Sequence, residues 1–247
     1  MKKNKLLLAS AIVVSLLTPM SQVKADWRRD NIGWWYSLNN GSYYKNQEAY
    51  IDGKIYKFDN RGYMVTGWQY NSYNNGDFHA WYYYDPVNGD EKRGWQLIDG
   101  KWYYLTATGA ARGDQNIGGK IYYFDLVNCD MKTGWVSIKD SNGNPVWYYY
   151  DTESGEQLSG WQTIDGKAYC FDRFGRAYAG WHQLLDGKMY YFDPVNCDLK
   201  TGWLDLNGRR YYADPNDGGA FAKNKTLIID GVSYTFDIYG SVINNEP

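Results

Sequence analysis

Residues 94–105 read Gly-Trp-Gln-Leu-Ile-Asp-Gly-Lys-Trp-Tyr-Tyr-Leu, and variants of this stretch recur along the chain. Six Gly-Trp pairs open the copies, with their tryptophans at positions 68, 95, 135, 161, 181 and 203. The spacings are 27, 40, 26, 20 and 22 residues, and we interpret the 40 as two units of 20 of which one has lost its tryptophan. Periods of this length indicate a repeat protein in which each copy is one supersecondary unit that cannot bury its apolar face alone.

Each copy has the pattern of a β-hairpin. In residues 94–105, Trp95 to Ile98 is a predicted strand and Lys101 to Leu105 its return strand. Between them stands Asp99-Gly100, a pair typical of tight two-residue turns, and similar Asp-Gly pairs follow at 165–166, 186–187 and 230–231. Because a lone hairpin is marginal in water, we predict an all-β solenoid of about ten stacked hairpin repeats of about 20 residues each. The units begin near Trp27, Gln47, Gly67, Gly94, Asp114, Gly134, Gly160, Gly180, Gly202 and Lys223.

The N-terminal segment is predicted to lie outside this fold. Lys2, Lys3 and Lys5 precede an apolar stretch, and small residues lead up to Ala25, as in a cleaved secretory signal peptide. The predicted organisation is a signal peptide at 1–25, N-terminal capping repeats at 26–66, a Gly-Trp repeat solenoid at 67–222, and a C-terminal capping repeat and tail at 223–247. Two units are longer than the rest, which we interpret as enlarged first loops at 70–80 and 138–146.

Charge and hydropathy exclude two classes of partner. Without residues 1–25 the chain has 22 basic and 28 acidic residues, a net charge of −6. It lacks the clustered lysines and arginines that neutralise phosphates, so nucleic acid is not expected as a partner. No other stretch is long and apolar enough to span a membrane. We therefore expect a secreted protein attached non-covalently to a cell wall or surface.

The reactive residue types are sparse. Cys129 and Cys197 stand in matching contexts three repeats apart, which places them about 30 Å apart along a stack of strands, well beyond disulfide reach. With Cys170 they are predicted to be free thiols, and no Cys-x-x-Cys pair indicates zinc. His79 and His182 belong to no recognisable nucleophile motif. We expect no enzyme activity, no cofactor and no metal.

The stretch 94–105, together with Gly109, resembles the choline-binding, or cell-wall-binding, repeats of Gram-positive surface proteins and their bacteriophages. Residues 32–64 look like the start of the repeat module in pneumococcal autolysin, and the resemblance extends over residues 27–243. It implies a left-handed β-solenoid with choline sites at the joints between consecutive hairpins. Related repeats also occur in glucan-binding streptococcal proteins and in clostridial toxins.

The resemblance also implies which residues would bind choline. A quaternary ammonium cannot donate a hydrogen bond, so aromatic faces must recognise it. Each site would use a Gly-Trp tryptophan, the first and third aromatics of the return strand, and the next Gly-Trp tryptophan. Two sets are complete: Trp68, Trp81, Tyr83 and Trp95; and Trp135, Trp147, Tyr149 and Trp161. Two are altered: Trp95, Trp102 and Tyr104, followed by Asp114 where a tryptophan is expected; and Trp181, Met189, Tyr191 and Trp203, with Met189 as an apolar substitute.

The same aromatics also fit a purely structural role, because large rings fill the small core of a short hairpin. The middle residues of the return strands are expected to be core residues. These are Tyr82, Tyr103, Tyr148, Tyr190 and Tyr211.

The functional hypothesis is a secreted, non-catalytic cell-envelope protein that recognises phosphocholine on teichoic or lipoteichoic acid. Single sites would bind on the order of millimolar, and several sites acting on one polymer would add avidity. Two alternatives remain open. One is an α-glucan-binding, lectin-like protein that stacks sugars on the same rings. The other is an adhesin whose enlarged loops contact a host or bacterial protein.

Overall fold

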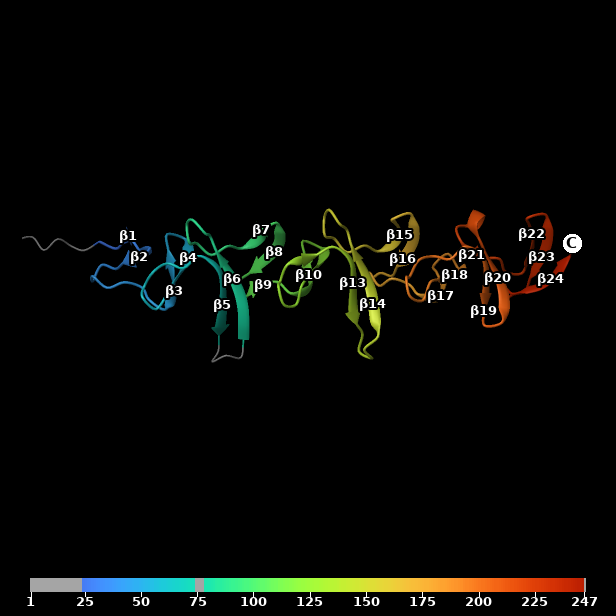
Figure 1. The fold of residues 1–247 in the computed structure, drawn as a ribbon, viewed down its shortest axis with the longest axis horizontal. Helices are drawn as coiled ribbons and strands as arrows, with labels where there is room; N and C mark the ends of the chain where they lie inside the picture. Colours follow the sequence, from blue (N-terminus) through green and yellow to red (C-terminus); the bar gives the residue numbers. More distant parts are fainter. Residues whose placement is uncertain (1–23, 74–77, 247) are drawn as a thin grey trace, which may run out of the picture. The chain divides into compact units, whose positions relative to one another are not determined.

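The computed structural model describes residues 24–73 and 78–246, and within them the chain forms ten antiparallel β-hairpins (Figure 1). The prediction of an all-β protein built of hairpin repeats is thus confirmed. The hairpins fall into two compact units, one up to Lys92 and one from Arg93 onward. Residues 1–23 of the predicted signal peptide lie outside the described residues.

The first unit contains three hairpins and the second contains seven, counted over the described residues. The hairpins of the first are β1–β2 (Asp26–Arg29, Trp34–Ser37), β3–β4 (Gln47–Ile51, Lys54–Phe58) and β5–β6 (Gly67–Tyr73, Phe78–Tyr84). Those of the second are β7–β8 (Gly94–Ile98, Lys101–Thr106), β10–β11 (Gly113–Ile117, Lys120–Phe124), β13–β14 (Gly134–Lys139, Pro145–Tyr150), β15–β16 (Gly160–Ile164, Lys167–Phe171), β17–β18 (Gly180–Gln183, Met189–Phe192), β19–β20 (Gly202–Leu206, Arg209–Asp214) and β22–β23 (Lys225–Ile229, Val232–Phe236).

Short third strands extend four of the sheets in the second unit. They are β9 (Gly109–Ala110), β12 (Met131–Lys132), β21 (Ala220–Phe221) and β24 (Val242–Glu246), and a 3-10 turn at Pro215–Asp217 precedes β21. Strand β24 pairs with β23, with Thr235 opposite Asn244. Part of the predicted C-terminal tail is therefore a strand of the last sheet.

The Asp-Gly pairs close two-residue turns where the sequence predicts them, with one exception. Asp99 and Gly100 have φ angles of 51° and 76°, as the favoured hairpin turn requires. At Asp186-Gly187 the prediction is wrong: the innermost strand pair is Gln183 with Met189, and a longer loop closes the hairpin. The reason is one extra residue between the Gly-Trp pair and Asp186, compared with the unit that begins at Gly94.

The two predicted enlarged loops are mostly strand. In β5–β6 the ladder continues through Tyr70 opposite Trp81, and in β13–β14 through Ile138 opposite Val146. Residues such as Tyr70, Ile138 and Val146, which are aromatic or β-branched, favour this extension of the ladder. In the second unit only Asp140–Asn144 remains as the connecting turn of β13–β14, and this hairpin is visibly longer than its neighbours (Figure 1).

One joint repeats along the chain. On β13–β14, Trp135 is paired with Tyr149, while the middle residue Tyr148 points to the opposite face. Such a hairpin thus has a tryptophan face and a middle-aromatic face, and at six joints within the two units the tryptophan packs on the middle aromatic of the next hairpin. The ring centres of Trp135 and Tyr169 are 4.9 Å apart. The same contact joins Trp27 to Tyr56 (4.8 Å), Trp95 to Tyr122 (4.9 Å), Trp161 to Tyr190 (5.3 Å), Trp181 to Tyr211 (5.1 Å) and Trp203 to Tyr234 (4.7 Å).

At two positions in the described chain an acid replaces the tryptophan of this joint. The hydroxyl of Tyr84 donates to Glu48 Oε1 at 2.9 Å, and that of Tyr150 donates to Asp114 Oδ1 at 2.8 Å. Tyr150 is fully buried, and burial followed by this hydrogen bond raises the pKa of its hydroxyl. At the position of these tyrosines, several hairpins that follow a tryptophan carry phenylalanine, such as Phe171, whose ring centre lies 5.8 Å from that of Trp135.

Backbone hydrogen bonds reinforce the joints. After each hairpin the chain turns back and bonds to the return strand of the hairpin before it. The Ala177 amide donates to the Trp147 carbonyl at 2.8 Å, and the Met64 amide donates to the Trp34 carbonyl at 2.7 Å. These bonds hold the first aromatic of a return strand in place through its own backbone.

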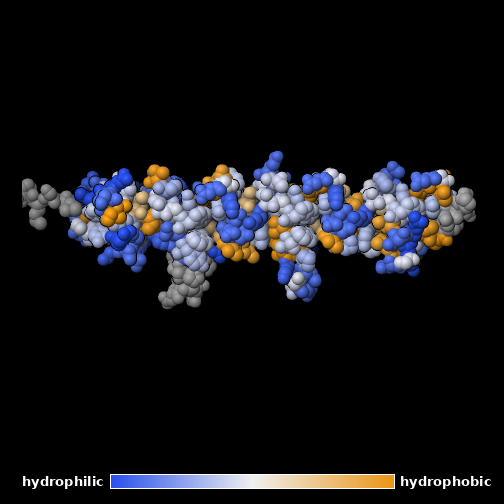
Figure 2. Space-filling model, viewed as in Figure 1, coloured by the Kyte–Doolittle hydropathy of each residue, from blue (hydrophilic) through white to orange (hydrophobic). Residues whose placement is uncertain are grey.

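The middle tyrosines are core residues as predicted, with one partial exception. Tyr82, Tyr103, Tyr190 and Tyr211 are buried, whereas Tyr148 is half-buried. Outside the core, apolar side chains such as Val87 and Val195 are exposed on connecting turns. Figure 2 shows apolar patches separated by hydrophilic surface.

The three cysteines are free and buried, as predicted. Burial raises the pKa of each thiol, that of Cys170 to about 11, so the reactive thiolate is scarce at neutral pH. In the described part of the chain, no helix is long and apolar enough to cross a membrane.

The joint between hairpins predicts a specific loss of stability. Phe192 is fully buried and its ring centre lies 5.8 Å from that of Trp161, so Phe192→Ala should lower the free energy of unfolding by about 3–5 kcal/mol. Leu185→Ala, at a fully exposed loop position, is the control and should change it by less than about 0.5 kcal/mol. Urea unfolding followed by near-UV circular dichroism measures both, and equal losses would contradict the packing described.

Candidate functional site

The second unit contains a cavity of about 340 Å³ at the joint between β13–β14 and β15–β16. Trp135, Trp147 and Tyr169 form its aromatic walls. The ring centres of Trp135 and Trp147 are 6.3 Å apart with an interplanar angle of 84°, and Tyr169 meets Trp135 at 61°. Three mutually inclined rings make a rounded corner rather than a flat platform.

The remaining walls are polar at their edges. Lys167, two residues before Tyr169 on β16, lies on the same face of the strand, and Val195 and Asn196 complete the lining. The last two belong to the turn after β18, where Asp193 Oδ1 accepts hydrogen bonds from both of their amides at 2.9 Å. One cavity therefore draws on three consecutive hairpin units.

Lys167 gives the cavity a positively charged rim. Its side chain is 57% exposed, and Nζ lies 3.9 Å from Oδ1 of the buried Asp198. That distance is too long for a hydrogen bond, and Oδ1 has no hydrogen-bond partner in the described structure. Oδ2 of Asp198 accepts instead from Lys200 at 3.1 Å. Asp198 thus attracts the Lys167 ammonium electrostatically but accepts no hydrogen bond from its N–H groups.

The first unit contains a cavity of the same composition, with a volume of about 580 Å³. Its aromatic walls are Trp27, Trp34 and Tyr56, which correspond to Trp135, Trp147 and Tyr169. Its rim is formed by Lys54, Val87 and Asn88, which correspond to Lys167, Val195 and Asn196. Two further residues, Arg29 and Met64, also line it. The guanidinium carbon of Arg29 lies 5.6 Å from the centre of the Trp34 ring. Lys54 Nζ is 3.4 Å from the buried Asp90, which repeats the lysine–aspartate arrangement of the second unit.

This cavity was not predicted from the sequence, because Trp27 follows an aspartate instead of a glycine and its hairpin was interpreted as a cap. A signal was nevertheless present. Trp27 and Trp34 are seven residues apart, as are Trp95 and Trp102. The ladder pairs Trp27 with Tyr36, which corresponds to the pair of Trp135 and Tyr149.

The structure rearranges the predicted set around Trp135. Tyr149 contacts Trp135 with ring centres 5.1 Å apart but is not among the residues that line the cavity. Trp161 lies on the far face of its hairpin, where it contacts Tyr190. Strand alternation explains this, because the residue that faces back toward Trp135 is the middle aromatic, Tyr169. The fourth wall predicted from Trp161 is thus supplied by Tyr169, which is buried and still lines the cavity.

The joint after Trp95 keeps the same three rings. Trp95 is 6.2 Å from Trp102, 5.3 Å from Tyr104 and 4.9 Å from Tyr122, measured between ring centres. The wall that seemed lost at Asp114 is therefore present as Tyr122.

In the first unit, Trp68 lies 6.4 Å from Trp81 and 5.0 Å from Tyr83 between ring centres. These three predicted residues are brought together by β5–β6. Trp95 belongs to the other unit, and its part in this site stays a prediction.

The predicted set of Trp181, Met189, Tyr191 and Trp203 is split between two joints. Trp181 contacts Tyr191 at 5.2 Å, and Met189 packs against the cluster that contains Tyr211. At Trp203 the guanidinium carbon of Arg210 lies 4.5 Å from the ring centre. Arg210 replaces the first aromatic of the return strand, so the chain's own cation covers the tryptophan there.

No metal site is evident in the described residues. No group of three or more histidine, cysteine, aspartate or glutamate side chains is arranged there to hold a metal ion. His182, whose ring lies against Tyr178 at 4.2 Å, shares a hydrogen bond with the Ala179 carbonyl.

Two family sequence profiles match the chain. One, described as a choline-binding repeat, matches residues 111–160, and the other, described as a putative cell wall binding repeat, matches residues 94–111. None of the curated proteins matches.

Among solved structures, choline binding protein F from Streptococcus pneumoniae is 24% identical, with 89% of this chain and 99% of that chain covered and a TM-score of 0.49. The modular autolysin LytC from the same organism is 22% identical, with 89% of this chain and 48% of that chain covered and a TM-score of 0.54. The likeness to the autolysin supports the hairpin-repeat fold.

The turn that holds Val195 and Asn196 predicts a response to acid. Hydrogen bonds from the Asn196 amide, Lys200 and the Val195 amide lower the pKa of Asp193 to about 2. The stabilisation from this carboxylate is complete above the unfolded value of 3.8 and is lost as the pH falls through about 2. In urea midpoints at pH 7, 4 and 2.5, Asp193→Asn should be less stable than the native protein at pH 7 and lose less on acidification. Parallel acid profiles would contradict this assignment.

Proposed function

Because this chain carries repeats of the choline-binding and cell-wall-binding family, we propose that it is a secreted, non-catalytic cell-surface protein that binds phosphocholine on teichoic or lipoteichoic acid. The observation that carries the proposal is the cavity of three inclined aromatic rings with a lysine at its rim. A cavity of this kind lies in each compact unit, and in the first unit Arg29 and Met64 also line it.

The aromatic corner suits a trimethylammonium group. Such a group is round, carries positive charge on apolar methyl groups and has no proton to donate, so ring faces are its best partners. Each ring contributes about 0.5–2 kcal/mol, and three rings therefore give a dissociation constant on the order of millimolar after the costs of association. Two or more such sites on one chain, acting on a polymer with many cholines, raise the overall affinity by about 10²–10⁴.

The rim lysine supports phosphocholine over free choline. The phosphate in a phosphocholine group lies next to the ammonium, so a ligand seated against Trp135 and Trp147 would bring its phosphate to the cavity edge. Lys167 stands at that edge with its donors not engaged by Asp198, and Lys54 stands at the corresponding edge in the first unit.

The non-catalytic part of the proposal rests on the sequence, where neither histidine belongs to a nucleophile motif. Purified protein should release no fragments from cell walls. The adhesin hypothesis now concerns the long hairpins β5–β6 and β13–β14 rather than loops, and binding to a protein that withstands saturating choline would favour it.

The aromatic corner predicts a defined loss of choline binding. Trp34→Ala combined with Trp147→Ala removes one wall from each cavity and should weaken choline binding about 2- to 30-fold, since each ring contributes about 0.5–2 kcal/mol. Tyr239→Ala, at an exposed aromatic residue distant in sequence from both cavities, is the control and should bind choline normally. Calorimetric titration of residues 26–247 with choline and with an isomalto-oligosaccharide measures this. Binding heat with the oligosaccharide but not with choline would favour the α-glucan hypothesis. No binding heat with either ligand would indicate that the aromatic rings serve only as core residues.

The rim lysines predict a ligand-dependent effect. Lys54→Met combined with Lys167→Met should weaken phosphocholine binding about three- to fivefold, the size of an exposed charge-assisted contact, and leave choline binding unchanged. Lys45→Met combined with Lys223→Met makes the same charge change at exposed positions outside the cavities. Competition titrations with choline and phosphocholine measure these affinities. Equal losses of phosphocholine affinity in both double variants would refute a role for Lys54 and Lys167.

A further inference from the structure

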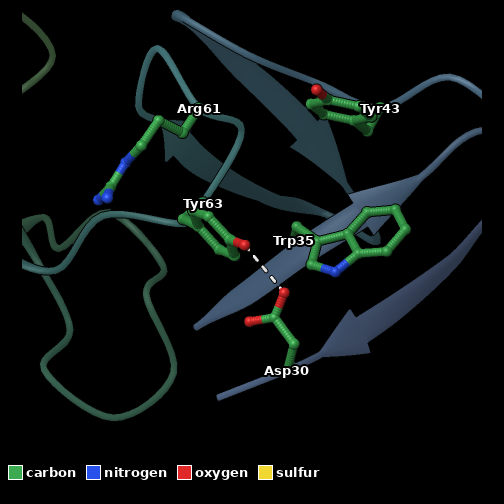
Figure 3. Close-up of a pocket in the computed structure, with 5 residues that line it drawn as sticks. All are labelled: Asp30, Trp35, Tyr43, Arg61 and Tyr63. Atoms are coloured by element: carbon green, nitrogen blue, oxygen red, sulfur yellow. Dashed lines mark hydrogen bonds between the residues drawn. The ribbon is translucent and has the colours of Figure 1, made fainter. Parts of the chain in front are cut away.

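A chemically different cavity lies in the first unit (Figure 3). It has a volume of about 250 Å³ and is lined by Asp30, Trp35, Tyr43, Arg61 and Tyr63. Trp35 alternates along β2 with Trp34 and Tyr36, so it faces away from the tryptophan cavity of the same hairpin. Trp35 is the middle aromatic of the first hairpin, and its ring contacts Tyr43, with ring centres 5.8 Å apart.

The rings of this cavity are held in place by backbone. A Cβ on Gly62 would stand 2.4 Å from the Tyr43 ring, and a Cβ on Gly33 would stand 3.4 Å from the Tyr63 ring. Two glycines thus allow two tyrosine rings to lie directly on the main chain. Trp35 and Tyr43 meet at 71°. The cavity is therefore formed in advance rather than assembled around a ligand.

A fixed carboxylate stands at its edge. Asp30 Oδ1 accepts hydrogen bonds from the amides of Ile32 at 2.8 Å and Gly33 at 3.1 Å, and Oδ2 accepts from the Tyr63 hydroxyl at 2.8 Å (Figure 3). These bonds lower the pKa of Asp30, so it is ionised at neutral pH. The Oδ2 atom keeps acceptor capacity toward the cavity, because a carboxylate oxygen accepts more than one hydrogen bond.

A cation also lines the cavity, and its charge is paired with a second carboxylate. The Arg61 guanidinium extends away from Trp35 and Tyr43 and donates to Asp59 Oδ2 through Nε at 3.3 Å and one terminal nitrogen at 3.2 Å (Figure 3). A guanidinium has five N–H donors, so others remain at the rim. The lining thus offers acceptors on Asp30 and donors on Arg61. Hydroxyl groups, which donate and accept, match such a lining.

We propose that this cavity binds one ring of a neutral saccharide, as part of a glycan chain. The C–H face of the sugar ring would pack on Trp35 beside Tyr43, one hydroxyl would donate to Asp30 Oδ2, and another would accept from Arg61. The volume lies below the 300–1,000 Å³ of sites for drug-sized ligands and matches a single sugar ring. This site is separate from the cavities assigned to phosphocholine and does not depend on that assignment.

The test is a saccharide titration of the full mature chain in saturating choline, with an N-acetylglucosamine trisaccharide and isomaltotriose as probes. Trp35→Ala and Asp30→Asn should each weaken binding of at least one probe tenfold or more, and Trp35→Phe should keep it within a few-fold. Trp34→Ala is the matched control: it changes the neighbouring tryptophan on the opposite face and should affect choline but not the saccharide. Circular dichroism confirms that each variant is folded.

Three results would overturn the proposal. Saccharide binding that choline displaces, or that Trp34→Ala weakens, would move the sugar to the tryptophan cavities. Choline binding that depends on Trp35 and Asp30 would make this cavity a cation site. No binding of either saccharide at tens of millimolar would leave it without the proposed ligand. Absence of choline binding, by contrast, would refute only the function proposed above.

Discussion

The contact between the tryptophan of one hairpin and the middle aromatic of the next is the interaction on which the other features of this structure depend. It buries the middle tyrosines, which supply much of the core of each short unit. It also leaves an edge of the tryptophan uncovered, because Tyr169 meets Trp135 at 61° rather than lying flat on it. The same packing that stabilises the joint therefore leaves an inclined aromatic corner open to a small ligand.

Much of the fold follows from the sequence because its signals are local. The Gly-Trp period and the Asp-Gly turns predict the ten hairpins with boundaries close to those observed. The errors arise where the number of residues, not their type, decides the geometry. One added residue before Asp186 replaces a two-residue turn with a longer loop. The segments that contain Tyr70 and Ile138 pair across the hairpin, with Trp81 and Val146 opposite, so they lengthen the ladder instead of forming loops.

The site was predictable only in part, because its walls come from units that are distant in sequence. The resemblance identifies Trp135 and Trp147, and both line the cavity. Tyr169 was not among the predicted ligand-binding residues, because strand alternation gives the face of a residue but not which neighbour that face meets. Lys167 and Asn196 stand one and two hairpins further along, and no local pattern connects them with a tryptophan in an earlier unit.

The acid–tyrosine joints constrain the order in which hairpins can follow one another. Glu48 and Asp114 need a tyrosine hydroxyl in the following hairpin, whereas a tryptophan at that position packs on phenylalanine. Deleting or duplicating one hairpin beside such a joint would bury a carboxylate against an apolar ring, or leave the hydroxyl of Tyr150 unpaired. Beside such a joint, hairpins can therefore be gained or lost only in blocks that keep the acid with its tyrosine, whereas a hairpin between two tryptophan joints, such as β15–β16, is free of this constraint.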